Sequence, residues 1–592
     1  MYKDETIFDE ENTKIKFLNP FLEALGWNVR NVGLAPWERE VIFEASVKVG
    51  SQKKNPDYAF LIDGETIFFL EAKKPSRDIV KDKSHAFQAR RYGWSAKLPL
   101  CILTDFEEFA IYDTRIRPYE NDSATVARLK YYHYSDYIEK WDEIYTIFSK
   151  EAVFNGKFDE YFGKVEEKNK GDTEVDDEFL KEIEDWRELL ARNIALRNPE
   201  LTIDELNYAV QLIIDRIIFL RMAEDRGIEK TERLKDLTTK HDIYKNFCKI
   251  CREADEKYNS GLFHFNPYDT EDFTTDTYTL DLVIDDQVFK KIFKNLYYPT
   301  SPYEFSVIST EILGKVYEQF LGKIIRLTEG HHAKIDDKPE VKKAGGVYYT
   351  PQYIVDYIVK HTVGELIEGK TPNQISKIRI IDPACGSGSF LIRAYNYLLK
   401  YHLEYYSNLK RPPKNVIYTY KGNTYLTINE KKRILLNNIY GVDIDPLAVE
   451  VTKLSLLLKV LEDQNKDQLE QQRTLIPERT LPNLKNNIKC GNSLISTDVY
   501  EKEYKTINEP NMAHPFDYAK EFPNNGEFDI IIGNPPYVRQ ESIKDMKPYL
   551  KTKYELYEGQ ADKYVYFFEK SLKLLKNDGY LGYITCNEFK LD

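Results

Sequence analysis

The stretch SKIRIIDPACGSGSF, residues 376–390, decides the fold class of this 592-residue chain. An apolar run ends at Asp382, a glycine-rich turn follows, and the helix SFLIRAYNYLL begins at its end. The same order of strand and polar turn recurs in NIYGVDIDP, NIKCGNS, FDIIIGNPPY and GYLGYIT. This repetition predicts an α/β domain with a doubly wound sheet, and such sheets bind ligands at the carboxyl ends of their strands.

The glycine-rich turn is not a phosphate loop, because it lacks the lysine and hydroxyl that hold phosphate and magnesium. A dinucleotide site is also disfavoured, because the next acid at a strand end, Asp443, follows Asp382 by far more than about 20 residues. Gly386 and Gly388 allow the backbone to approach a ligand closely, and the Asp443 carboxylate can accept both hydrogen bonds of a ribose diol. The pattern favours a cofactor with a single adenosine.

Asn534, Pro535, Pro536 and Tyr537 follow the apolar strand FDIIIG and therefore lie at a strand's carboxyl end. The exocyclic amine of adenine is a poor nucleophile, because its lone pair is delocalised into the ring. The Asn534 side chain and the Pro535 carbonyl could localise that lone pair and aim it at the methyl group of a sulfonium donor. Tyr537 offers a ring on which a base flipped out of a duplex could stack.

These motifs, DPACGSGSF, GVDIDP, GNSL and NPPY in this order, resemble the γ-class adenine-specific DNA methyltransferases, which use S-adenosyl-L-methionine. The upstream stretch GGVYYTPQYIV resembles the motif that precedes the glycine loop in that class. The resemblance implies which residues hold the methyl donor. Thr350 and Asp382 would contact its methionine end, and Gly386 and Gly388 its backbone. Asp443 would contact its ribose, and Asn492 its adenine ring.

A second decisive stretch, NPDYAFLIDGETIFFLEAKKP, predicts a β-hairpin near the amino terminus. A two-residue turn at its Asp-Gly pair would place Asp57 and Glu71 on opposite faces. A three-residue Ile-Asp-Gly loop with a bulge would place Asp57 opposite Phe69, and Asp57, Glu71 and Lys73 would share one face. We predict the bulged register.

Two carboxylates beside a lysine are the groups that metal-assisted phosphodiester hydrolysis requires. Asp57 and Glu71 could hold magnesium, and the Lys73 ammonium could position water or stabilise the charge of the transition state. The alternative is a surface hairpin whose charges are simply solvated.

The context of the hairpin favours the catalytic interpretation. Pro56 precedes the first carboxylate, and the next helix carries Gln88 and Tyr92 four residues apart. This arrangement resembles the PD-(D/E)xK nuclease fold, in particular the amino-terminal domain of type I and type IIG restriction enzymes. The resemblance implies a nuclease role for Gln88, with Glu23 and Glu40 as candidate additional acids.

The sequence between the two motif-bearing regions predicts helices and no catalytic group. Cys248 and Cys251 form a CxxC pair, but a tetrahedral zinc site needs two further ligands, and the nearest candidate, His264, stands alone. We therefore expect ordinary helix cysteines. The pair His331-His332 follows a glycine and is expected to be solvated.

Composition limits the class of protein. The net charge is −13, so no global basic field indicates nucleic acid, and any grip on DNA must be local. Six scattered cysteines suit a reducing compartment, the acidic amino terminus is no signal peptide, and no apolar run is long enough to cross a bilayer. A cytoplasmic protein without a membrane partner is expected.

Together these observations predict a multidomain α/β protein with a PD-(D/E)xK nuclease-like domain at 1–150, a helical connector at 151–334 and a Rossmann-like methyltransferase domain at 335–592. The expected function is that of a type IIG restriction–modification enzyme, which methylates adenine in double-stranded DNA and cleaves DNA with magnesium. The alternatives are a methyltransferase for RNA or protein glutamine, a non-cleaving adenine methyltransferase, and an assembly subunit of a phage-defence system.

The resemblance also implies elements beyond the GYLGYIT strand. In the γ class the sheet continues into a hairpin with a second stacking aromatic, and a target recognition domain follows. The sequence ends at CNEFKLD without a region assignable to base reading. We expect either a truncated chain, which the incomplete sheet favours, or specificity supplied by a separate chain.

Overall fold

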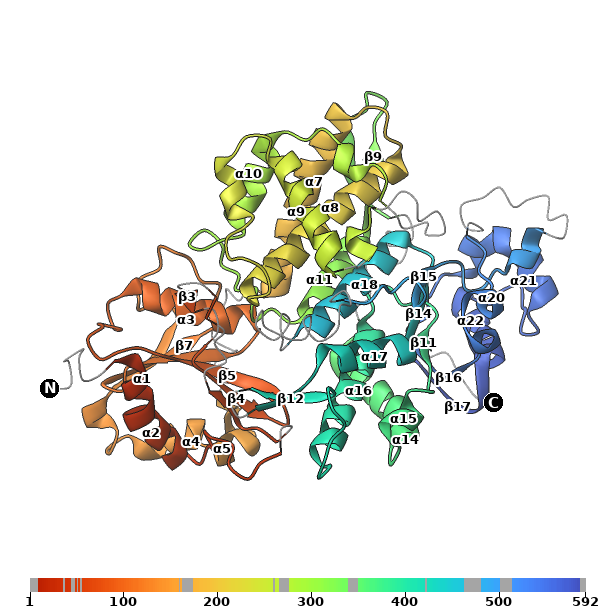
Figure 1. The fold of residues 1–592 in the computed structure, drawn as a ribbon. Coiled ribbons are helices and arrows are strands. Elements are labelled where there is room, and N and C mark those ends of the chain that lie inside the picture. The colour runs from red at the N-terminus through yellow and green to blue at the C-terminus, as the bar shows by residue number, and fades with distance from the viewer. Residues whose placement is uncertain are drawn as a thin grey trace. The chain divides into compact units, whose positions relative to one another are not determined.

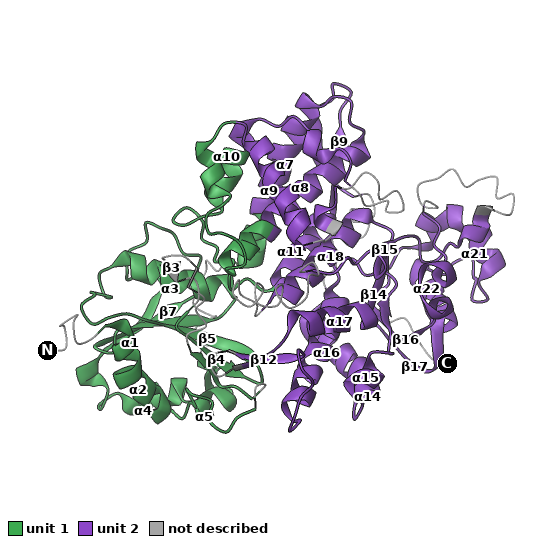
Figure 2. Cartoon of the chain, in the orientation of Figure 1, with its two compact units in different colours: residues 1–181, 220–241, 289–309 green, residues 182–219, 242–288, 310–592 purple. Residues whose placement is uncertain are grey.

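The computed structural model describes residues 9–35, 38–43, 48–49, 52–53, 56–158, 160–161, 174–258, 261–265, 276–338, 350–420, 423–462, 481–500 and 514–585. The chain forms two compact units (Figure 2). The first contains residues 1–181, 220–241 and 289–309, and the second contains residues 182–219, 242–288 and 310–592. The glycine-rich stretch at residues 345–349 and the final residues CNEFKLD lie outside the described residues.

The first unit is built on a six-stranded mixed sheet with the order β1-β4-β5-β6-β7-β8. Only β5 and β6 pair in parallel among these strands, and helix α3 connects them. Its elements are α1 (Glu10–Thr13), η1 (Lys14–Leu18), α2 (Asn19–Ala24), β1 (Val41–Phe43), β4 (Tyr58–Ile62), β5 (Glu65–Ala72), α3 (Lys83–Ser95), β6 (Leu100–Thr104), β7 (Glu108–Asp113), β8 (Arg128–His133), α4 (Trp141–Phe148) and α5 (Lys150–Phe154). A separate two-stranded hairpin joins β2 (Lys48–Val49) and β3 (Gln52–Lys53).

Helices cover both faces of this sheet, because its strands alternate apolar side chains toward each side (Figure 1). Phe60 and Phe68 pack with Leu22 of α2 on one face. Phe69 packs with Ala86 and other residues of α3 on the opposite face. The result is a three-layer α/β unit in which α3 and the ends of β4 and β5 lie together.

The β4–β5 hairpin turns at two residues, so the predicted three-residue loop is wrong. Asp63 and Gly64 have φ values of 53° and 86°, the pair of positive values that a type I′ turn requires. The bulge lies inside β5 instead, where Ile67 is the extra residue between two cross-strand pairs.

The pairing beyond the bulge also differs from the prediction. Phe69 pairs with Ala59 rather than with Asp57. Because the extra residue shifts the pairing by one, Asp57 comes level with Glu71, and Asp57, Glu71 and Lys73 belong to the same face. The predicted register is wrong, whereas the shared face that it implied is present.

The first helix is present as three consecutive segments, α1, η1 and α2, and it ends before Gly26, whose φ is 86°. The middle segment, Lys14–Leu18, is wound as a π-helix. Pro20 follows it and has no backbone N–H to donate to the preceding turn. Such π segments often occur at functional sites, and this one begins with a buried lysine.

The second unit contains a five-stranded parallel sheet with the order β15-β14-β11-β16-β17 (Figure 1). Its strands are β11 (Ile380–Asp382), β14 (Ile439–Asp443), β15 (Ile488–Cys490), β16 (Phe528–Gly533) and β17 (Leu575–Tyr583). From β11 the chain adds β14 and β15 on one side of the sheet, and it then returns to add β16 and β17 on the other side. The order of the strands therefore reverses between β11 and β16. This order is the predicted doubly wound arrangement.

Helices of the second unit connect and flank these strands. They include α13 (Gln352–Val359), η6 (Lys360–Gly364), α14 (Glu365–Ile367), α15 (Pro372–Ile375), α16 (Ser389–Ser407), α17 (Ile428–Asn438), α18 (Pro446–Leu461), α20 (Tyr518–Glu521), α21 (Lys547–Lys553) and α22 (Lys563–Leu574), and a hairpin pairs β12 (Ile417–Tyr420) with β13 (Asn423–Leu426). Helix α16 starts directly after Gly388, which has a left-handed φ of 84°. Asp445 caps α18 by accepting a hydrogen bond from the Leu447 N–H.

The region between the motifs is helical, as expected, and its helices contribute to both units. They are α7 (Val175–Arg197), α8 (Ile203–Asp225), α9 (Ile243–Tyr258), α10 (Asp286–Asn295) and α11 (Thr310–Leu321). Cys248 and Cys251 are buried on α9 as ordinary helix cysteines. A hairpin that we did not predict, β9 (Lys323–Leu327) with β10 (Ala333–Asp337), holds His331-His332 in its turn. No helix among the described residues is both long and apolar enough to cross a membrane.

Two candidate active sites

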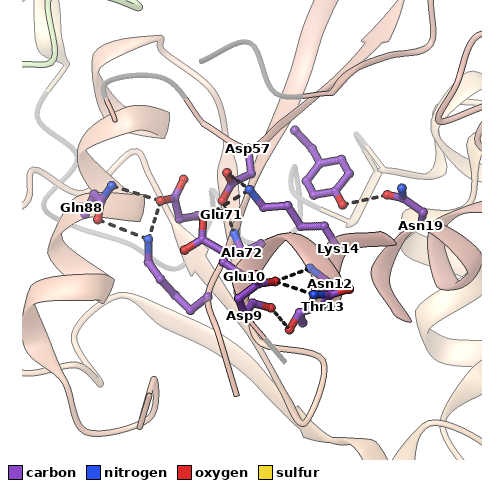
Figure 3. A network of polar contacts seen from close by, with 12 residues as sticks. Asp9, Glu10, Asn12, Thr13, Lys14, Asn19, Asp57, Glu71, Ala72 and Gln88 are labelled. Carbon is purple, nitrogen blue, oxygen red and sulfur yellow. Dashed lines mark hydrogen bonds and ion pairs between the residues drawn. The ribbon is translucent and has the colours of Figure 1, made fainter. Parts of the chain in front are cut away.

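The first candidate site lies where β4, β5, α3 and the first helix meet (Figure 3). Asp57 and Glu71 are almost fully buried, and Lys73 is 9% exposed. The Asp57 carboxylate accepts a hydrogen bond from the Ala72 backbone N–H at 2.7 Å, which fixes it beside the end of β5. The structure therefore brings the three predicted residues together.

Lys73, which follows β5, and Gln88 of α3 together orient the second carboxylate, Glu71. Lys73 Nζ donates to Glu71 Oε1 at 2.6 Å, and Gln88 Nε2 donates to the same oxygen at 3.0 Å. Burial lowers the pKa of Lys73, but the charge and the hydrogen bond of Glu71, together with the charges of Asp57 and Glu10, raise it more, so its pKa lies above the usual value. Burial raises the pKa of Tyr92, which stands one turn after Gln88. Lys73 is a cation held in place, and Gln88 positions its partner.

Lys14 is a residue of this site that the sequence reasoning missed. Its side chain is 1% exposed, and its Nζ lies 2.6 Å from Asp57 Oδ1 and 3.3 Å from Glu10 Oε1 (Figure 3). A signal was present, because Lys14 stands four residues before Leu18 and in line with the apolar face of the helix. A lysine on a buried face needs a buried anion, and Asp57 supplies it.

The two carboxylates suit a hard divalent cation, because magnesium is commonly bound through one or two carboxylates with water completing its shell. The described residues contain no group of three or more histidine, cysteine, aspartate or glutamate side chains that could form a complete protein cage. The two candidate additional acids point elsewhere: Glu40 pairs with Lys150 at 2.7 Å, and Glu23 is exposed to solvent.

The second candidate site lies at the topological reversal of the parallel sheet. Asp382 ends β11 and Gly533 ends the neighbouring strand β16. A Cβ atom on Gly533 would lie 2.6 Å from Asp382 Oδ1, and Gly533 has a φ of 155°, so this close approach requires glycine. Burial raises the pKa of Asp382 to about 8, and the Ala384 N–H that donates to it at 3.0 Å offsets this only in part.

The glycine-rich turn is fixed against the next strand. The Gly386 N–H donates to Asp443 Oδ2 at 2.8 Å, and Thr452 of α18 donates to the Gly386 carbonyl at 2.8 Å. Gly386 and Gly388 both have left-handed φ values, of 53° and 84°. A Cβ atom on Gly388 would meet Thr452 at 2.9 Å, so the turn and α18 pack closely. These contacts hold the Asp443 carboxylate at the strand end, where the prediction needs it.

Asn534 meets Thr350 at the same edge of the sheet. Asn534 Nδ2 donates to Thr350 Oγ1 at 3.0 Å. This bond directs the amide, and Asn534 Oδ1 is then a buried acceptor without a hydrogen bond among the described residues. Since a buried acceptor without a donor is costly, this oxygen fits a ligand that brings an N–H.

The remaining predicted residues lie at the same end of the sheet. Asn492 is buried, and its side chain accepts a hydrogen bond from the Leu494 N–H at 3.1 Å. Tyr537 is 36% exposed, and its hydroxyl donates to the Ile584 carbonyl at 2.7 Å. That bond holds the Tyr537 ring, which lies 5.7 Å from the ring of Tyr564. An exposed, oriented ring is suited to stacking.

Two family models match the chain at these sites. One is described as the Eco57I restriction-modification methylase and matches residues 437–591, and the other is the type I restriction enzyme R protein N terminus, which matches residues 38–120. The type II restriction enzyme and methyltransferase RM.Eco57I of Escherichia coli is 37% identical to the chain over 98% of it. Nearly the whole chain is therefore similar to a type II restriction enzyme and methyltransferase. The matched residues include Asp57, Glu71, Asp443 and Asn534.

Other restriction–modification proteins are more distantly similar to the chain. A putative type II restriction enzyme and methyltransferase of Methanocaldococcus jannaschii is 28% identical over 82% of the chain and 46% of its own length. The chain also covers 56% of the E. coli relative, so it spans about half the length of the curated relatives that it matches. Among solved structures, the type IIG restriction endonuclease BpuSI matches 97% of this chain and 51% of its own, at 14% identity and a TM-score of 0.29.

Proposed function

We propose that the chain is a bifunctional restriction–modification protein that methylates adenine in double-stranded DNA and cleaves DNA with magnesium. The methyltransferase half of the proposal rests on Asn534 Oδ1, a buried acceptor at the point where the strand order reverses, which receives no hydrogen bond among the described residues. The proposal assigns three functional regions: a nuclease of the PD-(D/E)xK type at 1–150, a helical connector at 151–334 and a methyltransferase at 335–592.

In the methyl transfer, Asn534 Oδ1 and the Pro535 carbonyl accept hydrogen bonds from the exocyclic amine of adenine. These bonds localise the amine's lone pair and aim it along one direction. Tyr537 stacks on the flipped base and repays part of the few kcal/mol that leaving the duplex costs. When bound, S-adenosyl-L-methionine supplies the electrophilic methyl group.

The same groups would hold the donor. Gly386 and Gly388 would lie against its backbone, Asp443 would accept hydrogen bonds from its ribose hydroxyls, and Asn492 would face its adenine ring. Thr350 and Asp382 would lie at its methionine end. The close packing of the glycine turn on Thr452 supports this assignment, because it keeps the turn and the Asp443 carboxylate in register.

In the nuclease half, magnesium bound at Asp57 and Glu71 would lower the pKa of a water molecule and neutralise charge on the phosphate. Lys73 remains protonated beside Glu71, so its part is to position water or to stabilise negative charge, and not to accept a proton. Gln88 keeps the Glu71 carboxylate in place.

The test is to incubate the chain with duplex DNA and a radiolabelled methyl donor, with and without magnesium. Label on DNA that disappears with Asn534→Ala, and cleavage that disappears with Lys73→Ala while methylation remains, would support two separate sites. The Lys150→Met variant is a matched control for the loss of a lysine outside both sites. Label on RNA or on protein instead of DNA would overturn the proposal.

A further inference from the structure

Helix α11 carries two glutamates, Glu311 and Glu318, which are seven residues apart and therefore lie on one face of the helix. The helix belongs to the second unit, and this face packs toward α16 and α18, the helices that follow β11 and β14. Because α11 precedes every methyltransferase motif, its residues were not among those predicted for the cofactor.

Glu311 is a structural carboxylate. Its Oε1 accepts a hydrogen bond from Asn396 at 2.8 Å and lies 3.5 Å from an Arg393 nitrogen and 3.9 Å from Lys459 Nζ. Burial raises the pKa of Glu311, but Lys459, Arg393 and the hydrogen bonds to the carboxylate together lower it more, so the pKa lies below its usual value. These three partners anchor α11 to α16 and α18.

Glu318 is in a different environment. Its Oε2 accepts a hydrogen bond from Ser387 Oγ at 3.3 Å, and no lysine, arginine or histidine among the described residues forms an ion pair with it. The side chain is half-buried. Burial raises the pKa of Glu318 to about 7, and the Ser387 hydroxyl offsets this only in part. A half-buried carboxylate without a cation is costly unless a ligand provides one.

The position of Ser387 shows where such a ligand would lie. Ser387 is buried between Gly386 and Gly388, in the turn that we assign to the methyl donor. Asp382, which the proposal places at the methionine end of the donor, precedes the same turn, and burial raises its pKa to about 8. Glu318 brings a second carboxylate to this turn, and that carboxylate could pair with the positively charged amino group of the donor.

We propose that Glu318 is a cofactor-binding residue that recognises the α-ammonium group of the methyl donor. The inference rests on the proposed methyltransferase function and adds to it a contact from outside the methyltransferase motifs. It assigns to α11 a part in selecting a donor that carries an intact amino acid end.

The test compares ligands with and without that end. Isothermal titration measures the affinity of the full chain for S-adenosylmethionine, for S-adenosylhomocysteine and for 5′-methylthioadenosine, which lacks the amino acid. Glu318→Gln should weaken binding of the first two by about 10- to 100-fold, the effect of losing one charge-assisted hydrogen bond, and change 5′-methylthioadenosine less than about twofold. Asp443→Asn should weaken all three, because it removes the ribose contact.

Two further variants keep the comparison interpretable. Glu311→Gln lies on the same face of α11, so it should lower the melting temperature without changing the preference among the three ligands. If Glu318→Gln does not fold, Glu318→Asp withdraws the charge by one methylene group and allows the same comparison. Equal losses for all three ligands with either Glu318 variant, or no loss for any, would overturn the assignment.

Failure of the inference is distinct from failure of the proposed function. If the unaltered chain binds none of the three ligands, the methyltransferase proposal fails. If it binds all three and Glu318→Gln binds them equally well, only the role of Glu318 is refuted.

Discussion

Replacing Lys14 with methionine should destabilise the first unit strongly, because the change leaves the Asp57 carboxylate buried without its cation. Lys14 is 1% exposed, Asp57 is 0% exposed, and 2.6 Å separates their charged atoms. Removing one partner of a buried pair typically costs about 3–5 kcal/mol. The Ala72 N–H still donates to Asp57, so the lower end, about 3 kcal/mol, is expected.

Tryptophan fluorescence during urea or thermal unfolding can measure this loss, because four of the five tryptophans lie in the first 150 residues. A loss of about 3 kcal/mol should lower the melting temperature of a unit of this size by about 6–12 °C. Lys150→Met is the comparison variant: this lysine is 41% exposed, and its buried partner Glu40 keeps a hydrogen bond from the Asn28 N–H at 2.8 Å, so its removal should cost less, about 1–2 kcal/mol.

A double variant separates the charge effect from lost packing. Lys14→Met combined with Asp57→Asn removes both charges, so it should recover more than half of the stability lost by Lys14→Met alone. Two results would refute the reasoning: a single-variant loss no larger than that of Lys150→Met, or a double variant that is less stable than the single one.

Three other predictions concern the parallel sheet. Gly533→Ala should destabilise the second unit by about 1–3 kcal/mol and abolish methylation, whereas Gly559→Ala, which meets no atom within 4 Å, should be neutral in the same melting and transfer assays. Because the pKa of Asp382 is raised, the folded state holds a proton that the unfolded state releases. The free energy of unfolding should therefore fall as the pH rises from about 4 to 8. Denaturation curves of Asp382→Asn should lack this fall. Tyr537→Ala should weaken binding of a duplex with a mismatched target adenine by about 1–3 kcal/mol, while Tyr537→Phe, which keeps the ring and loses the hydroxyl that donates to Ile584, should lose less.

The doubly wound sheet and its site were predictable because their determinants are local in the sequence. The predicted residues of this site other than Thr350 end or closely follow an apolar strand, as Asp382 and Asn534 do, and parallel strands bring their carboxyl ends to one edge. The order of the strands then places β11 beside β16. Thr350 follows no strand of this sheet, and its place at the site was expected only from the family resemblance.

The nuclease site depended on features that are not local. The Asp63-Gly64 pair predicts the turn from the sequence alone. The position of the bulge at Ile67 depends instead on packing on both faces of the sheet. Lys14 meets Asp57 across 43 residues of sequence, and only its place on the apolar face of a helix indicated burial. Glu318 likewise reaches the glycine turn from a helix that carries no motif.

The identity of the methylated atom tests the central claim most directly. Duplex DNA incubated with the chain and a donor carrying a trideuterated methyl group can be digested to nucleosides and analysed by mass spectrometry. The account predicts deuterated N6-methyldeoxyadenosine as the product, and none of it with Asn534→Ala. Label on cytosine, or undiminished N6 labelling with Asn534→Ala, would contradict the account.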